Sequence, residues 1–216
     1  MKYSILIYLL VGILFIPVIL SKKYDGSEGK FVDIEAINKY IRFGFTTKRL
    51  KANLTTRADI EELYKYVLDN EYMYPYDDTI KQPKTKEEAI KYLEDQLKLK
   101  DSFYFCIKLK ETNTPIGQIN FKFFRKGVLT VSYWIAKEYS NKKYLTEIGR
   151  SFIEDLFMNS KKVEILELYT LDSNKYSQRF INGLFFYLED KYKFSSKRYY
   201  SRYDKSLVKF HYLFKK

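Results

Sequence analysis

Apolar and polar residues along the middle of the chain follow two patterns that are typical of β-strands. Apolar side chains either alternate with polar ones or form short runs bounded by turn residues, as strands do when one or both faces are buried. Short turns, such as residues 110–115 and 125–127, separate neighbouring strands and favour antiparallel pairing. The predicted strands are residues 49–55, 103–109, 116–124, 128–136, 162–171, 192–200 and 207–214.

Between the strands, apolar residues recur at the three- and four-residue spacing of amphipathic helices. Thr56 suits an N-cap, and Asp59 falls at the third helical position after it. Thr85 and Glu88 have the spacing of a capping box. The predicted helices are residues 31–45, 56–70, 85–97, 142–157 and 174–188. From residue 47 onward the order is β-α-α-β-β-β-α-β-α-β-β, which predicts the α+β class, with flanking helices on a mixed, mostly antiparallel sheet.

The beginning of the chain is apolar enough to enter a membrane. Residues 4–20 carry no charged side chain and predict an N-terminal hydrophobic helix, at the short end for a membrane span and the long end for a signal-peptide core. Ile19-Leu20-Ser21 is a poor cleavage site, so we favour a retained anchor over a cleaved signal. Lys22 and Lys23 follow directly and favour a cytoplasmic domain, with a secreted or luminal one as the alternative.

These patterns divide the chain into three parts. Residues 1–21 form the anchor or signal peptide, and residues 22–46 form a linker with a short helix. Residues 47–216 form the folded domain, and the 46% hydrophobic content of the chain is enough for a core. Cys106 is the single cysteine, which excludes an intrachain disulfide, and with only 1 His we expect no metal site.

The net charge of +12 is concentrated at the end of the chain. In residues 191–216, Lys and Arg far outnumber Asp204 and are interleaved with Tyr. The simplest interpretation is a pair of terminal strands with a solvated basic face. Contact with an anionic surface is the alternative, whereas we do not expect nucleic-acid binding, because no nucleic-acid motif accompanies the charge.

The stretch from Val131 to Ile148 has the pattern of an anion-binding site. Val131–Ile135 is an apolar, aromatic run of strand type, and a loop rich in Lys and small polar residues follows from Ala136 to Lys143. The next residues begin an amphipathic helix. Free backbone N–H groups and the positive end of the helix dipole attract phosphate at such a place.

Four local motifs, in order, point to a known family. The first strand begins with T-K-R-L at residues 47–50, and the hairpin at residues 110–117 reads K-E-T-N-T-P-I-G. S-Y-W at residues 132–134 precedes E-Y-S-N-K-K-Y-L-T-E at residues 138–147. The late helix carries Asn174, Ser177, Arg179, Leu184 and Phe186 at matching positions. Through these motifs residues 47–216 resemble the GCN5-related N-acetyltransferases (GNAT), closest to the ribosomal-protein-alanine acetyltransferase-like (RimJ/RimL-type) branch.

The resemblance implies a fold whose fourth and fifth strands part. The pantetheine arm of acetyl-CoA lies in that gap, and the amine acceptor attacks the thioester directly, without an acyl-enzyme. Acetyl-CoA is thus the implied cosubstrate, and the aromatic loop at residues 72–76 helps to shape the acceptor site. The cofactor-binding residues that the resemblance implies are Trp134, Ile135, Ser140, Asn141, Lys142, Lys143, Tyr144, Asn174 and Ser177.

The chain departs from the family at the loop and at the expected acid. Asn141 and Lys143 stand where glycines are usual, and glycine reaches positive φ without strain. The position of the tyrosine that serves many relatives as the acid is Ile181 here. Ser177 and Tyr176 are the remaining catalytic candidates, and Thr130 stands at the fourth-strand position where an acidic residue is common.

Three functions are therefore open. The first is a membrane-tethered N-acetyltransferase that acts on the primary amine of a protein N-terminus or a small molecule. The second is a catalytically inactive binding module of the same fold, with a degenerate CoA loop. The third is a protein that binds an anionic lipid surface or nucleic acid through residues 191–216.

Overall fold

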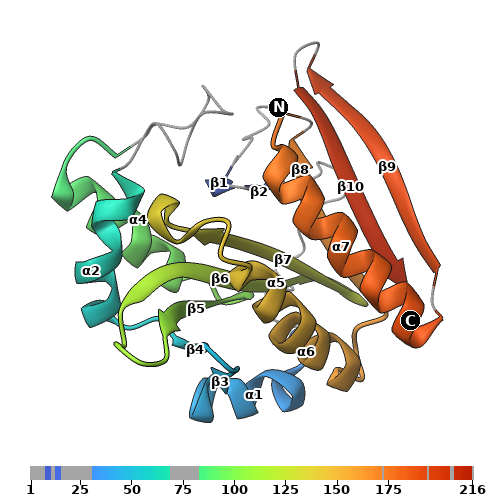
Figure 1. Ribbon diagram of the computed structural model, residues 1–216, viewed down its shortest axis with the longest axis horizontal. Helices are drawn as coiled ribbons and strands as arrows, with labels where there is room; N and C mark the ends of the chain where they lie inside the picture. The colour runs from blue at the N-terminus through green and yellow to red at the C-terminus, as the bar shows by residue number, and fades with distance from the viewer. Residues whose placement is uncertain are drawn as a thin grey trace, which may run out of the picture.

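A single sheet organises the described part of the chain, as the computed structural model shows (Figure 1). The structure describes residues 8–10, 13–15, 31–68, 83–171, 173–193, 195–204 and 207–215. In these residues the sheet has 8 strands in the order β3-β4-β5-β6-β7-β8-β10-β9. All neighbours pair antiparallel except β7 and β8, which run parallel. The strands are β3 (Phe45–Thr46), β4 (Leu50–Leu54), β5 (Ser102–Leu109), β6 (Pro115–Arg125), β7 (Val128–Ile135), β8 (Ile165–Leu171), β9 (Ser195–Asp204) and β10 (Leu207–Lys215).

Helices cover both faces of this sheet (Figure 1). Helices α1, α5, α6 and α7 share one hydrophobic core with one face, and α2 and α4 share a smaller core with the other. The helix that begins at α5 is continuous into α6 through a π-helical turn at Gly149–Ile153. The helices are α1 (Ile34–Phe43), α2 (Arg57–Val67), α4 (Lys86–Leu97), α5 (Tyr144–Ile148), α6 (Glu154–Asn159) and α7 (Lys175–Tyr192).

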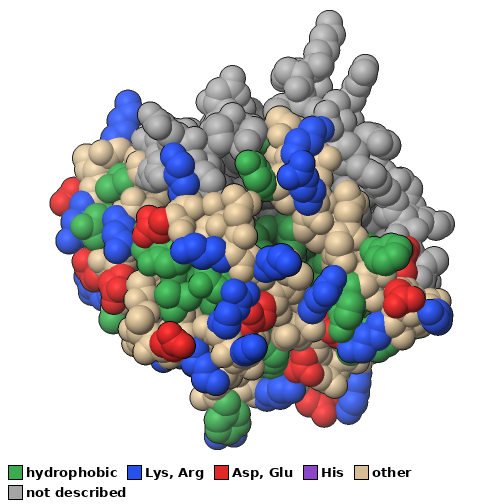
Figure 2. All heavy atoms as spheres, in the orientation of Figure 1, with side chains coloured by type: hydrophobic (Ala, Val, Ile, Leu, Met, Phe, Trp, Pro, Cys, Tyr) green, Lys and Arg blue, Asp and Glu red, His purple; other side chains and the backbone are tan. Residues whose placement is uncertain are grey.

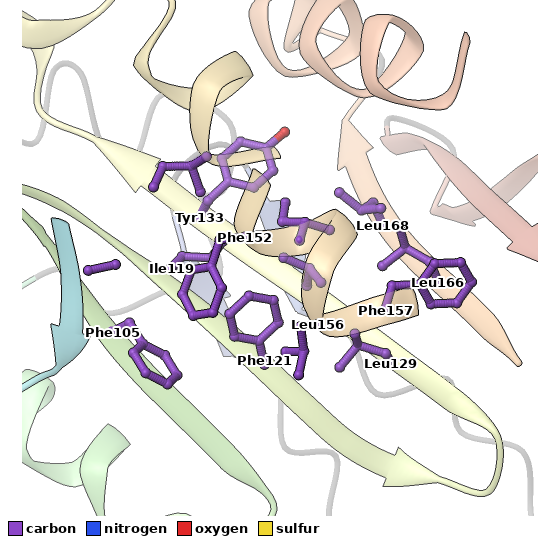
Figure 3. Packing of buried hydrophobic residues seen from close by; sticks show 14 of the residues in the cluster. Phe105, Ile119, Phe121, Leu129, Tyr133, Phe152, Leu156, Phe157, Leu166 and Leu168 are labelled. Atoms are coloured by element: carbon purple, nitrogen blue, oxygen red, sulfur yellow. The ribbon is translucent and has the colours of Figure 1, made fainter. Parts of the chain in front are cut away.

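The larger core is centred on Phe152, in the π-helical turn. Its ring lies 4.7 Å from that of Phe45 and 4.9 Å from that of Tyr40, centroid to centroid. From the sheet, Phe105 and Phe121 approach it at 5.1 and 4.8 Å (Figure 3). Because one side chain contacts four rings from four elements, the helix that follows the β7–α5 loop is fixed firmly on the sheet.

The sequence predicted the central elements and their caps well. Thr56 accepts a hydrogen bond from the Asp59 N–H, which confirms it as the N-cap of α2. The Asp59 carboxylate also accepts from the Thr56 N–H at 2.9 Å, which makes a capping box that was not predicted there. Thr85 caps α4 by accepting from the Glu88 N–H at 3.2 Å, but the Glu88 carboxylate accepts from the Lys84 N–H at 2.8 Å, so only half of the predicted capping box forms. The predicted α+β class and mixed, mostly antiparallel sheet are confirmed.

The predicted N-terminal helix is wrong in the described part of residues 4–20. Tyr8–Leu10 and Ile13–Phe15 are short strands, β1 and β2, which pair antiparallel with each other. A short apolar run fits a buried strand as well as a helix, so composition alone does not decide between them. A search of the described residues for a helix long and apolar enough to cross a membrane finds none.

Several predictions concern residues outside the described ones. These are the rest of residues 4–20, the linker before residue 31, and the aromatic loop at residues 72–76. The terminal strands β9 and β10 are present as predicted, with β10 beside β8 and β9 at the edge of the sheet. The side chains of the basic tract beyond residue 193 are not described, so its contact with an anionic surface stays a prediction.

Candidate functional site

The parallel strands β7 and β8 part halfway along their length. They pair only at Val128 with Ile165, Leu129 with Leu166, and Thr130 with Glu167. Beyond these pairs β7 continues to residue 135 and β8 to residue 171, with no further pairing between them. Beyond Thr130 the backbone N–H and C=O groups of β7 therefore have no partner on β8, and we call the space between the two diverging strands the gap.

A buried ion pair lies at the last paired level. The Glu167 side chain is 1% exposed and forms a salt bridge with Arg125 from β6. The Thr130 hydroxyl donates a hydrogen bond to Glu167 Oε2 at 2.9 Å. Burial alone would lower the pKa of Arg125, but the hydrogen bond and charge of Glu167 raise it above its ordinary value. A buried carboxylate with two such partners holds β6, β7 and β8 together where β7 and β8 begin to part.

Thr130 is therefore the partner of a carboxylate that sequence reasoning missed. The signal was present in the sequence, because Glu167 interrupts the apolar run Ile165-Leu166-Glu167-Leu168 of a strand. A charged residue in such a run needs a buried partner, and only the fold reveals that this partner is Arg125.

At its other end, β7 is held close to β6 by a glycine. A Cβ at Gly117 would lie 2.1 Å from Trp134 O, so only glycine permits this approach. Gly117 is the last residue of the hairpin motif that the sequence shares with its family. Its absent side chain fixes the path of β7 into the loop that follows.

The loop between β7 and α5 adopts left-handed backbone at both positions where glycine was expected. Asn141 has φ of 60° and Lys143 has φ of 63°. Such a conformation costs roughly 1–2 kcal/mol for a residue with a Cβ, with Asn paying less than Lys. The loop therefore keeps a glycine-type backbone without its glycines, so the side chains of Asn141 and Lys143 do not prevent the phosphate-loop conformation.

Backbone donors of this loop are available to an anion. Within the described residues, the N–H groups of residues 141–146 donate no hydrogen bond to the chain, and the next N–H, that of Glu147, donates to Lys143 O at 3.0 Å. Asn141, Lys142 and Lys143 are exposed. Figure 2 shows Lys and Arg side chains over the face of the molecule that carries this region. Free N–H groups before a helix, with cations beside them, form a cradle for phosphate.

Arg49 from the first motif clamps this loop. Its Nε donates to Glu147 Oε2 at 2.7 Å, its backbone N–H donates to Glu147 Oε1 at 2.9 Å, and its Nη1 donates to Lys142 O at 3.0 Å. The guanidinium also lies 4.5 Å from the centre of the Tyr144 ring. Arg49 thus contacts the loop carbonyl of Lys142, the ring of Tyr144 at the first helical position, and the Glu147 carboxylate of the first helical turn.

Glu147 completes the clamp. Burial alone would raise its pKa, but hydrogen bonds from Thr47 and Arg49 hold the pKa of this carboxyl below its usual range. Thr47 and Arg49 come from the same T-x-R-L motif, which indicated a family resemblance but no role for either residue. In the structure the motif positions the loop.

On the far side of the gap, the start of α7 contributes a pair of buried hydroxyls. Asn174 caps α7 by accepting from the Ser177 N–H at 2.9 Å. The Ser177 and Tyr133 hydroxyl oxygens lie 2.8 Å apart, and both residues are buried. The Tyr133 ring packs edge-on against Phe180 at 4.6 Å. This bond links β7 to α7 across the level where β7 and β8 have parted.

The other predicted site residues lie in different surroundings. Tyr176 is 65% exposed, so the structure does not bring it to the buried Ser177 hydroxyl. Trp134 is buried and donates from its indole N–H to Gln118 Oε1 at 3.4 Å, which is a packing role, and Ile135 beside it is also buried. The Ser140 hydroxyl donates to Lys137 O at 2.7 Å within a 3₁₀ turn. The functional roles of all these residues stay predictions.

Other chemistries find no support in the described residues. A search of them for a group of three or more His, Cys, Asp or Glu that could bind a metal finds none. Cys106 is fully buried on β5, and burial raises the pKa of its thiol far above the ordinary value, so it is not a nucleophile.

A parallel strand pair that parts in front of a loop–helix anion cradle is the arrangement that the resemblance to the GNAT family implies. Residues 34–184 match the family described as Acetyltransferase (GNAT) domain, and the chain belongs to this family. A comparison with curated proteins finds no match.

Solved structures share this fold. A GNAT-family acetyltransferase from Bacillus anthracis has a TM-score of 0.63 and 17% identity, over 79% of this chain and 97% of that one. RimL, a ribosomal L7/L12 alpha-N-protein acetyltransferase in complex with coenzyme A, has a TM-score of 0.61 and 12% identity, over 77% and 94%. The microcin C7 self-immunity acetyltransferase MccE, in complex with acetyl-CoA and AMP, has a TM-score of 0.57 and 13% identity, over 79% and 93%. At these identities the likeness shows the fold alone.

The described residues fit the acyl-CoA that this family uses. The N–H groups of residues 141–146 fit a pyrophosphate, and the unpaired edge of β7 after Thr130 fits an extended arm with amide groups. Lys142 and Lys143 supply positive charge beside the cradle.

The first prediction concerns the ion pair between Arg125 and Glu167. Arg125→Met leaves Glu167 buried without its cation, and we expect the free energy of unfolding to fall by about 3 kcal/mol. Arg125→Met combined with Glu167→Met should recover most of that loss, because neither charge then remains buried. Urea unfolding measures both, with the exposed pair Lys91–Asp95 as control, where Lys91→Met should cost less than about 0.5 kcal/mol. Losses that simply add in the double variant would contradict the coupling.

The second prediction concerns the clamp. Arg49→Lys keeps the charge but cannot bind Glu147 and Lys142 O at the same time, so we expect the affinity for coenzyme A to fall about tenfold, or about 1.4 kcal/mol. Isothermal calorimetry measures it. Arg57→Lys is the matched control, because Arg57 is 81% exposed and pairs with Glu94 at 3.6 Å on α2, away from the loop. Equal affinity in Arg49→Lys and wild type would remove the positioning role.

Proposed function

We propose that the protein is an N-acetyltransferase that transfers the acetyl group of acetyl-CoA to a primary amine, on a protein N-terminus or a small molecule. The observation that carries this proposal is the loop before α5, where Asn141 and Lys143 adopt the left-handed backbone that glycines would supply. A chain that no longer binds a cofactor has no reason to keep two strained residues in an anion cradle. The clamp by Arg49 supports the same conclusion, because it stabilises this conformation.

Each part of the gap has a role in this reaction. Acetyl-CoA supplies an activated acetyl group as a thioester. The N–H groups of residues 141–146 bind its phosphates, and the free edge of β7 aligns its extended arm. The acceptor nitrogen forms a bond to the acetyl carbon and the carbon–sulfur bond breaks. The proton that the nitrogen loses passes through solvent to the departing sulfur, so the products are an amide and a free thiol. The leaving thiolate needs a hydrogen bond, and the Ser177 hydroxyl, which lies 2.8 Å from that of Tyr133, is the proposed donor.

An inactive binding module of the same fold is the second candidate. The observation in its favour is Ile181, which is fully buried in the core at the position where many relatives carry the acidic tyrosine. Under this alternative, Ser177 and Tyr133 would serve only to hold α7 on β7. Binding and turnover therefore need separate measurements.

The third prediction tests cofactor binding. At a concentration of acetyl-CoA about a hundred times its Kd, the melting temperature of the protein should rise by roughly 5–10 °C. Lys143→Gly should still bind, but about threefold more weakly, because the loop already has a glycine-type backbone and only an exposed charge is lost. Tighter binding by Lys143→Gly would show that the side chain obstructs the site. No shift in the wild-type protein would refute the proposed function.

The fourth prediction separates an enzyme from a binding module. Ser177→Ala should lower kcat for acetylation of amine-bearing peptides or small amines by about a hundredfold, with the Kd for acetyl-CoA little changed. Ser173→Ala is the matched control, because it removes the same group from an exposed side chain just before α7 and should leave kcat unchanged. Turnover is measured by release of free thiol. If the wild-type protein binds acetyl-CoA but acetylates no amine in a broad panel, the binding module is favoured.

A further inference from the structure

Among the described residues, one buried hydroxyl lacks a hydrogen-bond partner. Thr170 lies on β8 and is fully buried, yet its Oγ1 has no hydrogen-bond partner in the described part of the chain. Its backbone pairs with that of Phe210 on β10, so only the side chain is left over. Buried hydroxyls are nearly always hydrogen-bonded, because an unpaired one carries a free-energy cost. A group that binds at this place would remove that cost.

The register of the sheet places Thr170 at the gap. Leu129 and Leu166 are paired residues that both face the core of α5 and α6. Side chains alternate along a strand, so four residues further on Tyr133 and Thr170 lie at the same level and on the same face. At that level β7 and β8 are no longer paired. Tyr133 and Thr170 therefore stand at one level on the two strands that border the gap, which we call its two walls.

The two walls differ in one respect. The Tyr133 hydroxyl is already hydrogen-bonded to Ser177 at 2.8 Å, whereas Thr170 on the other wall has no such partner. The Thr170 hydroxyl is a neutral donor. It lies at the level of Tyr133, and the strand β7 runs about 10 Å further from that level to Ala136, where the anion-binding loop begins. Its ligand is therefore a neutral acceptor at the deep end of an extended molecule whose phosphates lie at residues 141–146.

We propose that the Thr170 hydroxyl binds the thioester end of acetyl-CoA by donating a hydrogen bond to it. The inference rests on the proposed function and adds a binding residue on β8, the strand opposite the one that aligns the cofactor arm. A thioester is uncharged and presents a carbonyl oxygen, which suits a lone hydroxyl without a charged neighbour on its face of β8. Thr170 thus fixes the acetyl group from one wall, and the Tyr133–Ser177 pair lies on the other.

The test uses two variants of the full chain. Thr170→Val has the same shape without the hydroxyl, and Thr170→Ser keeps the hydroxyl. In the free protein, Thr170→Val should melt at the same temperature as wild type or higher, because an unpaired hydroxyl has been removed. The affinity of Thr170→Val for acetyl-CoA, measured by calorimetry, should nevertheless fall about tenfold. Its affinity for coenzyme A should fall much less, because coenzyme A has no thioester. Thr170→Ser should bind acetyl-CoA like wild type.

Each other outcome overturns the inference. If Thr170→Val binds acetyl-CoA as tightly as wild type does, the hydroxyl makes no contact with the ligand. If the free Thr170→Val protein melts clearly below wild type, the hydroxyl already has a partner in the fold, such as a buried water. Failure of the wild-type protein to bind either acetyl-CoA or coenzyme A would refute the proposed function itself. Normal binding by wild type and by Thr170→Val would refute only the role of Thr170.

Discussion

The level at which β7 and β8 stop pairing determines where function can reside in this fold. Two parallel strands that remain paired along their full length offer no backbone groups to a ligand. Here a salt bridge between Arg125 and the buried Glu167 lies at the last pair of residues that joins β7 to β8. Beyond that pair, both strands continue but no longer pair with each other. The free edge of β7, the hydroxyls of Tyr133 and Ser177, and the loop before α5 all lie beyond that level. Removing the ion pair would weaken the one place that defines the gap.

The loop before α5 illustrates how a fold can preserve a backbone while its residues change. Lys143 and Asn141 occupy left-handed conformations that glycine adopts without strain. The strain is offset by contacts outside the loop, chiefly the three hydrogen bonds that Arg49 makes to Glu147 and to Lys142 O. The first strand therefore takes over part of the role that the glycines have in relatives. The absence of the two glycines from the sequence therefore does not mean that the backbone conformation of the loop is lost.

Local patterns were sufficient to predict most elements and several site residues. Thr56 with Asp59 marked the start of α2, and Asn174 marked α7, because caps depend on a few neighbouring residues. The roles of Arg49 and Glu167 could not be predicted, because their partners are distant in sequence. Arg49 binds Glu147, 98 positions away, and Glu167 binds Arg125, 42 positions away. The apolar N-terminus was misjudged for the opposite reason. Its composition fits both a helix and the strands at Tyr8–Leu10 and Ile13–Phe15, and nothing local decides between them.

The missing acid and the buried hydroxyls have one physical explanation. Ile181 fills the core where many relatives carry a tyrosine, so no phenol can reach the gap from that turn of α7. A turn earlier, Ser177 lies against the gap and is joined to Tyr133, a phenol that comes from β7 instead. The two residues thus bring a hydroxyl pair to the same gap from a different element. Because the bond crosses from β7 to α7, it also holds the helix in place, and a substitution that removes it would disturb position and chemistry together. The gap therefore combines a structural contact and a candidate proton donor in a single hydrogen bond.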